Sequence, residues 1–134
     1  MAEAYDYLAK AQENLAGAES ELAHRRYNSC VRGAYYACFH AAIAALIQAR
    51  IIMPEPDTLW GHDRVQAQFV GQLIQRRKQY PAHLRRTLTD LLAVRHKADY
   101  RVVSVSQREA RQAVQRAQEF VGAITAQGQS EGGG

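Results

Sequence analysis

The chain has 134 residues, of which 17 are Lys or Arg and 13 are Asp or Glu, giving a formal net charge of +4. A chain of this length fits one domain and is long enough to bury a hydrophobic core. Ala, Leu, Gln, Arg and Glu dominate, only three residues are Pro, and runs of β-branched residues are nearly absent, which predicts an all-α fold and argues against a β-rich one.

Two antiparallel helices are predicted at the N-terminal end. From Ala2 to Ala23, apolar residues recur at spacings of three and four in an otherwise Glu- and Gln-rich sequence, which indicates an amphipathic helix. This apolar stripe consists of Leu8, Ala11, Leu15, Ala18 and Leu22. Residues 24–27 form a tight turn, and Asn28 is a suitable N-cap for the next helix. Because the connection is so short, the two helices must run antiparallel.

The stretch from Asn28 to Ile47 is predicted to be the buried central helix. From Ala34 onward nearly every residue is apolar or aromatic, so the helix has no polar face to expose to water. This run of about fourteen residues is shorter than the roughly twenty needed to cross a bilayer, and we expect no membrane association. Cys30 and Cys38 lie too far apart on one helix to bridge each other, and the N-terminus lacks a signal-peptide pattern. We therefore expect a cytoplasmic protein with reduced cysteines.

Residues 50–61 interrupt the helical pattern with two prolines, one glycine and the only tryptophan. We expect a loop or hairpin arm here. The arm and the apolar central helix together present more apolar surface than four short helices can easily cover. We therefore predict a homodimer.

Three further helices are predicted in the second half, over residues 62–78, 82–98 and 106–126. Pro81 suits the first position of the second of these helices. Residues 99–105 read as a short extended link, and Ser106 and Glu109 then have the spacing of a capping box. Residues 127–134 include four glycines and are predicted to be a disordered tail. We thus expect an up-and-down bundle of four to five helices over residues 1–126, followed by this tail.

Positive charge is concentrated in the second half. Residues 76–116 carry eleven Lys or Arg and three acidic residues, a local excess of +8. Arginine outnumbers lysine fourteen to three, and the guanidinium group is the better bidentate ligand for phosphate. A solvated surface of helical arginines is the alternative interpretation.

The fingerprints of common enzyme classes are absent. The chain has no glycine-rich phosphate loop, no His-Glu-x-x-His, no Cys-x-x-Cys and no Gly-x-Ser-x-Gly. The five histidines, at positions 24, 40, 62, 83 and 96, do not have the spacing of a metal site. We expect no metal and no cofactor.

The segment from Arg95 to Tyr100 carries the most reactive side chains. On a helix, Arg95 and Asp99 are four residues apart and can pair, while His96 and Tyr100 share the adjoining face. This arrangement is either a structural ion pair near a helix end or an arginine presented to a phosphate. His40 by itself is more often a hydrogen-bonded core histidine, and the hydroxyls of Tyr35 and Tyr36 could reach a polar cleft.

Four segments together resemble the HEPN domain (higher eukaryotes and prokaryotes nucleotide-binding), in its small stand-alone prokaryotic branch. They are Tyr27–Ala42, Gly61-His62, Leu91–Tyr100 and Ser106–Val121. The resemblance covers residues 1 to about 126. It implies a bundle of four or five helices, commonly a homodimer with a cleft between the subunits, and a link to nucleotide binding or RNA cleavage. Many members of the family act as toxins or as partners of a minimal nucleotidyltransferase.

Family ribonucleases carry an Arg-x(4 to 6)-His motif near the end of the penultimate helix. Arg95 matches its arginine, and His96 matches the polar residue that often follows. The motif histidine is missing, because Tyr100, Arg101 and Val102 occupy its possible positions. In the small stand-alone branch, an Arg-x-x-Ala-Asp-Tyr sequence resembles what stands in place of this catalytic motif. Arg95 occupies its first position, and Asp99 and Tyr100 occupy its last two. Arg95 and His96 are the candidate catalytic residues.

We therefore predict a protein that binds RNA or a nucleotide through a basic cleft containing Arg95, Asp99 and Tyr100. Its expected role is a component of a toxin-antitoxin or defence module paired with a nucleotidyltransferase. Further candidates for the cleft are His40, His62 and Tyr36. Two alternatives stay open. One is an active, metal-independent endoribonuclease that uses His96, His40 or His62, and the other is a protein-interaction adaptor without nucleic-acid binding that docks a partner through residues 51–60.

Overall fold

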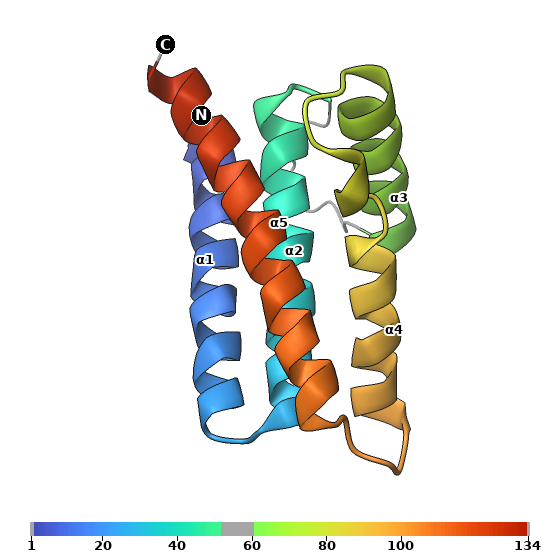
Figure 1. Cartoon of the computed structure of the whole chain (residues 1–134). Coiled ribbons are helices and arrows are strands. Elements are labelled where there is room, and N and C mark those ends of the chain that lie inside the picture. Colours follow the sequence, from blue (N-terminus) through green and yellow to red (C-terminus); the bar gives the residue numbers. More distant parts are fainter. Residues whose placement is uncertain (1, 52–60, 134) are drawn as a thin grey trace.

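The computed structural model describes residues 2–51 and 61–133, and in these ranges the chain is a bundle of helices without a β-strand (Figure 1). The predicted all-α fold is confirmed. In chain order the elements are α1 (Ala2–Ala23), α2 (Tyr27–Gln48), α3 (His62–Gln68), the π-helix η1 (Phe69–Arg76), the 3-10 turn η2 (Ala82–Leu84), α4 (Thr87–Tyr100) and α5 (Gln107–Gly133). Consecutive helices α1 and α2 run antiparallel, as predicted, and so do α4 and α5 (Figure 1). Most of the predicted arm, residues 52–60, lies outside the described residues.

Helix α2 is the central helix of the bundle, as its apolar sequence predicts. It packs against α1, α4 and α5, and it also contacts α3 and η1. By length and composition α2 could cross a membrane, because an 18-residue stretch of it has a mean hydropathy of 1.4. However, 78% of that stretch is buried inside the bundle. Burial of this extent is expected for the core helix of a helical domain. Cys30 and Cys38 are buried without a disulfide, and burial raises the pKa of Cys30 to about 11, so this thiol stays protonated near neutral pH.

The predicted stripe of α1 packs on α2. Ala11 and Ala18 are fully buried, and the leucines of the stripe are partly buried against the core. Gly33 of α2 faces this stripe, since a Cβ atom built there would lie 3.2 Å from Ala18 Cβ and 3.3 Å from the Asn14 carbonyl oxygen. Both distances are shorter than ordinary van der Waals contact. The missing side chain of Gly33 therefore allows α1 and α2 to approach closely.

The predicted N-cap role of Asn28 was wrong. Helix α2 begins one residue earlier, at Tyr27, and its N-cap residue Arg26 makes no side-chain capping hydrogen bond. Asn28 Oδ1 instead accepts a hydrogen bond from the backbone N–H of Val105, at 3.1 Å. Asn28 therefore fastens the link before α5 to the start of α2, a contact between residues far apart in the sequence.

The helix predicted over residues 62–78 changes type along its length. After α3, the backbone of η1 follows the i→i+5 hydrogen-bond pattern of a π-helix, and the N–H of Arg77 donates to the carbonyl of Gln72 at 3.0 Å. Phe69 and Ile74, five residues apart, are both buried. A π-helical turn thus brings onto one face two apolar residues that an α-helix would separate.

Helix α4 begins later than predicted. Pro81 has an extended backbone and precedes η2, whose 3-10 hydrogen bonds bring Leu84 into the core. The chain then turns once more, and α4 starts at Thr87 instead of Ala82 and continues to Tyr100, into the predicted extended link. Pro81 favoured a helix start, but it was compatible with a short 3-10 turn as well.

The capping box at the start of α5 is confirmed. The N–H of Ser106 donates to Glu109 Oε1 at 3.0 Å, and the N–H of Glu109 donates to Ser106 Oγ at 3.1 Å. Helix α5 continues to Gly133, beyond its predicted end at Ala126 and through residues for which we predicted disorder. Adding residues to an existing helix requires no new nucleation, so the glycines lower the helical propensity without preventing the extension.

Candidate functional site

One carboxylate joins two arginines from different helices at the α2–α4 contact. Asp99, near the end of α4, forms an ion pair with Arg32 of α2 through its Oδ1 atom. Its Oδ2 atom lies 3.5 Å from Nε of Arg95, one helical turn earlier. The predicted Arg95–Asp99 pair is therefore present, and Arg32 is added to it. The three side chains carry a combined charge of +1.

Two tyrosines of α2 hold the guanidinium group of Arg95. Its carbon atom Cζ lies 5.0 Å from the ring centre of Tyr35 and 5.4 Å from that of Tyr36. Both distances are within the range of a cation–π interaction. An Nη atom of Arg95 also donates a hydrogen bond to the Tyr36 hydroxyl, at 3.0 Å. Arg95 is therefore fixed by its neighbours, with 18% of its side chain exposed.

The Nε atom of Arg95 is buried and has no hydrogen-bond partner within the described parts of the chain, since the nearby Asp99 oxygen is not in hydrogen-bond geometry. A buried, charged N–H group without an acceptor is costly. Arg95 therefore has hydrogen-bonding capacity that the described residues do not use.

His62, at the start of α3, is connected to Arg95 through Tyr35. The Tyr35 hydroxyl lies 3.0 Å from Nδ1 of His62. Burial raises the pKa of Tyr35 to about 12, so the phenol stays protonated and can donate this hydrogen bond. Burial, together with the charges of Arg95 and His96, lowers the pKa of His62 against the opposing effect of Asp63. His62 is therefore neutral at pH 7, and a proton on its Nε2 atom fits the hydrogen bond at Nδ1.

His40 lies one turn further along α2, next to Tyr36. The two rings are stacked with centres 6.1 Å apart. Nδ2 of Asn14 on α1 is 3.1 Å from Nδ1 of His40, and burial lowers the pKa of this histidine. His40 is thus a hydrogen-bonded histidine at the edge of the tyrosine pair.

Tyr100 lies beside the site and not within it. Tyr100 is 77% exposed, its ring meets that of His96 at 5.8 Å, and no hydrogen bond joins it to Arg95 or Asp99 in the described structure. An open cavity of about 430 Å³ on this side of α4 is lined by both rings together with Lys97 and Arg101. Tyr100 therefore lies outside the site, whereas His96 is close enough for its charge to act on His62.

The structure brings together Arg95, Asp99, Tyr36, His62 and His40 from three helices, α2, α3 and α4. Sequence reasoning missed Arg32 as a member and did not include Tyr35 among the candidates for the cleft. A weak signal for Arg32 existed, because it is the one arginine of a mostly apolar helix, but its side chain is 44% exposed and does not require a carboxylate partner. What the sequence lacked was the identity of that carboxylate, which lies 67 positions away.

The excess positive charge of residues 76–116 is only partly neutralised. Its three acids pair with basic neighbours, as in Asp90–Arg116 at 2.7 Å and Glu109–Lys97 at 2.8 Å. The remaining basic side chains are exposed, at positions 76, 77, 78, 85, 101, 108 and 111. Some lie after η1 and η2, others near the junction of α4 and α5, so that the charge forms separate surface groups.

Within residues 2–51 and 61–133 no group of three or more His, Cys, Asp or Glu side chains could hold a metal ion. Among known protein families, the model of the HEPN domain matches residues 4–127, nearly the whole chain. No curated protein matches the chain.

Proposed function

This chain belongs to the HEPN domain family, and we propose that it binds RNA through the surface around Arg95. One observation carries the proposal: the guanidinium group of Arg95 lies against two tyrosine rings, in a cluster with Arg32 and Asp99 that has a local charge of +1. Arginine side chains are suited to phosphate because their N–H groups match its oxygens.

The neighbouring side chains suit a single strand of RNA. A phosphate would approach Arg95 and Arg32, and Arg32 has 44% of its side chain exposed. Tyr36 is 38% exposed and His40 stacks on it, so this pair offers an aromatic surface to an unstacked base. Base stacking on aromatic side chains is worth about 1–3 kcal/mol per base and tolerates any sequence.

RNA cleavage is the second candidate function, and the contact between His62 and Tyr35 favours it. Cleavage without a metal requires a base for the 2′-hydroxyl proton and a cation for the developing negative charge. Arg95 would supply the cation. His62, neutral at pH 7, would accept the proton at Nδ1 once its hydrogen bond from Tyr35 is released.

The decisive experiment compares the parent protein with Arg95→Ala, both incubated with a labelled single-stranded RNA in the presence of chelator. We expect Arg95→Ala to weaken RNA binding about tenfold, because one charge-assisted phosphate contact is lost. Arg86→Ala is the matched control, since it also removes an ion-paired arginine (Arg86–Asp90, 3.7 Å) but away from Tyr35 and Tyr36.

The possible outcomes separate the two functions. Binding lost only in Arg95→Ala, without cleavage by the parent, supports an RNA-binding site. Cleavage by the parent that is lost in Arg95→Ala and in His62→Ala supports a ribonuclease. Equal RNA binding by the parent, Arg95→Ala and Arg86→Ala, together with no cleavage that depends on Arg95, would contradict both.

We also propose a homodimer that works with a nucleotidyltransferase partner in a toxin-antitoxin or defence module. This proposal rests on what the family implies and on the exposed apolar side chains of the α4–α5 link, where Val102 is fully exposed and Val103 is 70% exposed. A dimeric mass by light scattering at micromolar concentration is expected. A monomeric mass would contradict the homodimer, and a nuclease-resistant complex with a protein of another class would favour the adaptor alternative.

A further inference from the structure

The start of α3 is attached to α2 by a hydrogen bond between two side chains. Helix α3 has seven residues, of which only Val65 is buried, and the residue before it makes no side-chain capping hydrogen bond. Gln66 donates to the backbone carbonyl of Arg85, at 2.8 Å. The first residue of α3, His62, contacts the Tyr35 hydroxyl of α2 at 3.0 Å. The contact between His62 and Tyr35 is therefore an anchor for the start of this short helix.

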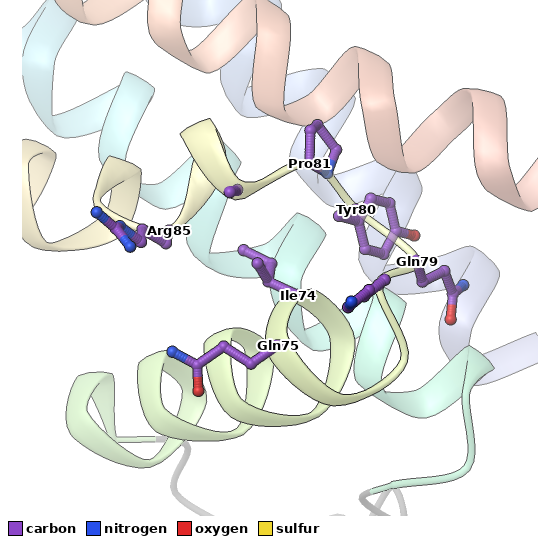
Figure 2. Close-up of a pocket in the computed structure, with 8 residues that line it drawn as sticks. Ile74, Gln75, Gln79, Tyr80, Pro81 and Arg85 are labelled. Atoms are coloured by element: carbon purple, nitrogen blue, oxygen red, sulfur yellow. The ribbon is translucent and has the colours of Figure 1, made fainter.

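The other end of the segment is fixed to the core, and open space lies beside it. After α3 the chain continues as η1, and the N–H groups of Gln79 and Tyr80 both donate to the Leu73 carbonyl, at 2.8 and 3.3 Å. The Tyr80 ring packs on Phe69, with ring centres 5.4 Å apart. Figure 2 shows Ile74 and Tyr80 beside a cavity of about 550 Å³ between η1 and the chain that leads into η2. The segment is thus anchored at its far end, and it is not closely packed against η2 along this cavity.

The hydrogen bond between Tyr35 and His62 has one direction at pH 7. The Tyr35 hydroxyl donates, and Nδ1 of neutral His62 accepts. Tyr35 is 2% exposed, and its hydroxyl has no other hydrogen-bond partner among the described residues. A proton on Nδ1 would turn the acceptor into a donor and leave the buried Tyr35 O–H without an acceptor. Protonation of His62 therefore breaks or reverses the contact that anchors α3.

Tyr35 also connects His62 to Arg95. The ring of Tyr35 lies 5.9 Å from the ring of His62 and 5.0 Å from the guanidinium carbon of Arg95. It meets the Tyr36 ring edge-on at 5.1 Å, and the Tyr36 hydroxyl accepts a hydrogen bond from Arg95 at 3.0 Å. A change in the orientation of Tyr35 therefore changes the position of the Arg95 guanidinium group.

The groups around His62 keep it neutral at pH 7. Four described groups face it from the elements that contact α3 and from α3 itself, and they are Asp63 of α3, Tyr35 of α2, and Arg95 and His96 of α4. Burial lowers the pKa of His62, and the two groups of α4 lower it further, against the opposing effect of Asp63. The remaining neighbour, η1, has one charged residue, Arg76, at its last position. His62 therefore takes up a proton only below the ordinary histidine pKa of 6.5.

We propose that His62 is a pH-dependent switch for the site around Arg95. Neutral His62 accepts the hydrogen bond from Tyr35, and this contact holds the start of α3 and the Arg95 guanidinium group in place. Protonated His62 releases Tyr35, loosens the start of α3 and raises the local charge from +1 to +2. As a regulator of RNA binding, the switch rests on the proposed function.

An NMR titration of the whole protein between about pH 8 and about pH 5 tests the switch. Two signals are followed, the ring of His62 and the Nε–H of Arg95, which is buried and therefore exchanges slowly with water. Tyr35→Phe removes only the hydroxyl and should fold, and His62→Gln removes the titrating ring. His96→Gln is the matched control, because it removes an imidazole that also acts on His62 by its charge but contacts Tyr100 instead of Tyr35.

The switch predicts a linked titration that depends on the tyrosine hydroxyl. In the parent and in His96→Gln, the Arg95 signal should change with the midpoint of the His62 ring, below pH 6.5. This change should be absent in His62→Gln. In Tyr35→Phe the midpoint of His62 should rise toward 6.5, because its neutral form has lost a hydrogen bond, and the Arg95 signal should no longer follow it.

Two NMR results would overturn the proposal. One is an Arg95 signal that does not follow the His62 titration in the parent. The other is an Arg95 signal that follows it equally in Tyr35→Phe, since the coupling would then be a direct effect of charge and would not require the hydroxyl.

RNA binding separates a failure of the switch from a failure of the proposed function. At low salt and below the midpoint of His62, single-stranded RNA should bind the parent about threefold more tightly than His62→Gln, with equal affinities above the midpoint. Linked titration of His62 and Arg95 without this difference in RNA affinity would support the switch and count against the RNA-binding site.

Discussion

Replacing Asp99 by Asn should lower the stability of the protein and raise its affinity for RNA. Asp99 is the carboxylate that Arg32 and Arg95 share. Asn has nearly the same shape and keeps an oxygen that can accept from Arg32, but the charge of the three side chains changes from +1 to +2. The substitution therefore removes an attraction within the protein and adds one toward an anion.

The expected loss of stability follows from the geometry. At 3.5 Å the Arg95–Asp99 pair has a Coulomb energy of about 1 kcal/mol in water and about 5 kcal/mol at an effective dielectric constant of about 20. Desolvation offsets most of the larger value, and exposed pairs contribute about 0.2–1 kcal/mol. Because Asp99 and Arg95 are only 22% and 18% exposed, we expect a loss of about 1–2 kcal/mol for both contacts together. For a chain of this length the melting temperature falls by about 3–8 °C.

RNA affinity should move in the opposite direction. One additional positive charge at about 6 Å from a phosphate in water contributes about 0.7 kcal/mol, which corresponds to about threefold tighter binding at low salt. Thermal unfolding followed by circular dichroism measures the stability, and fluorescence anisotropy with single-stranded RNA measures the affinity.

Asp90→Asn is the matched control for this experiment. Asp90 also lies on α4 and also contacts two arginines, Arg116 at 2.7 Å and Arg86 at 3.7 Å. It should lose a similar or smaller amount of stability, with less than about a twofold change in RNA affinity because it lies outside the proposed site. A folded Asp99→Asn variant that binds RNA more weakly would show that Asp99 acts by orienting Arg95, and would refute the charge-based expectation.

Two further predictions concern the packing of α5 and α2. Glu109→Ala should cost about 1–2 kcal/mol, because it removes the capping box with Ser106 and the ion pair with Lys97, whereas Glu109→Gln keeps the cap and should cost about 0.5 kcal/mol. The hydrogen bonds from Lys97 and from the Ser106 N–H lower the pKa of Glu109. The stabilisation by the Glu109 charge is therefore complete above the ordinary glutamate pKa of 4.5 and is lost as the pH falls through the lower folded-state pKa. In urea unfolding, the stabilities of the parent and Glu109→Gln should converge in acid, and a difference that stays constant with pH would contradict a stabilisation by the Glu109 charge. Gly33→Leu should destabilise the protein by about 1–3 kcal/mol in the same assay, since α1 leaves no room for the side chain. Gly17→Leu is the control and should not destabilise it, because nothing lies within 4 Å of the added Cβ. Equal stability of the two variants would mean that α1 and α2 can separate without cost.

The sequence alone determined the helical class, the order of the helices and the start of α5. These features depend on local patterns: the apolar stripe of α1, the apolar run of α2, and the reciprocal hydrogen bonds between Ser106 and Glu109. The Arg95–Asp99 pair was equally predictable, because residues four apart on a helix are neighbours wherever the helix lies. The four segments that resemble the HEPN domain can likewise be recognised from the sequence alone.

Only the tertiary structure decided which side chains meet across helices. Arg32 reaches Asp99, Tyr35 reaches His62, and Asn28 binds the Val105 N–H although its local position favoured a helix cap. The π-helical turn of η1 and the late start of α4 likewise depend on which apolar residues the core can accept. The choice of N-cap is worth only about 1 kcal/mol, so packing between distant segments can override such local preferences, and the sequence of one segment does not contain that choice.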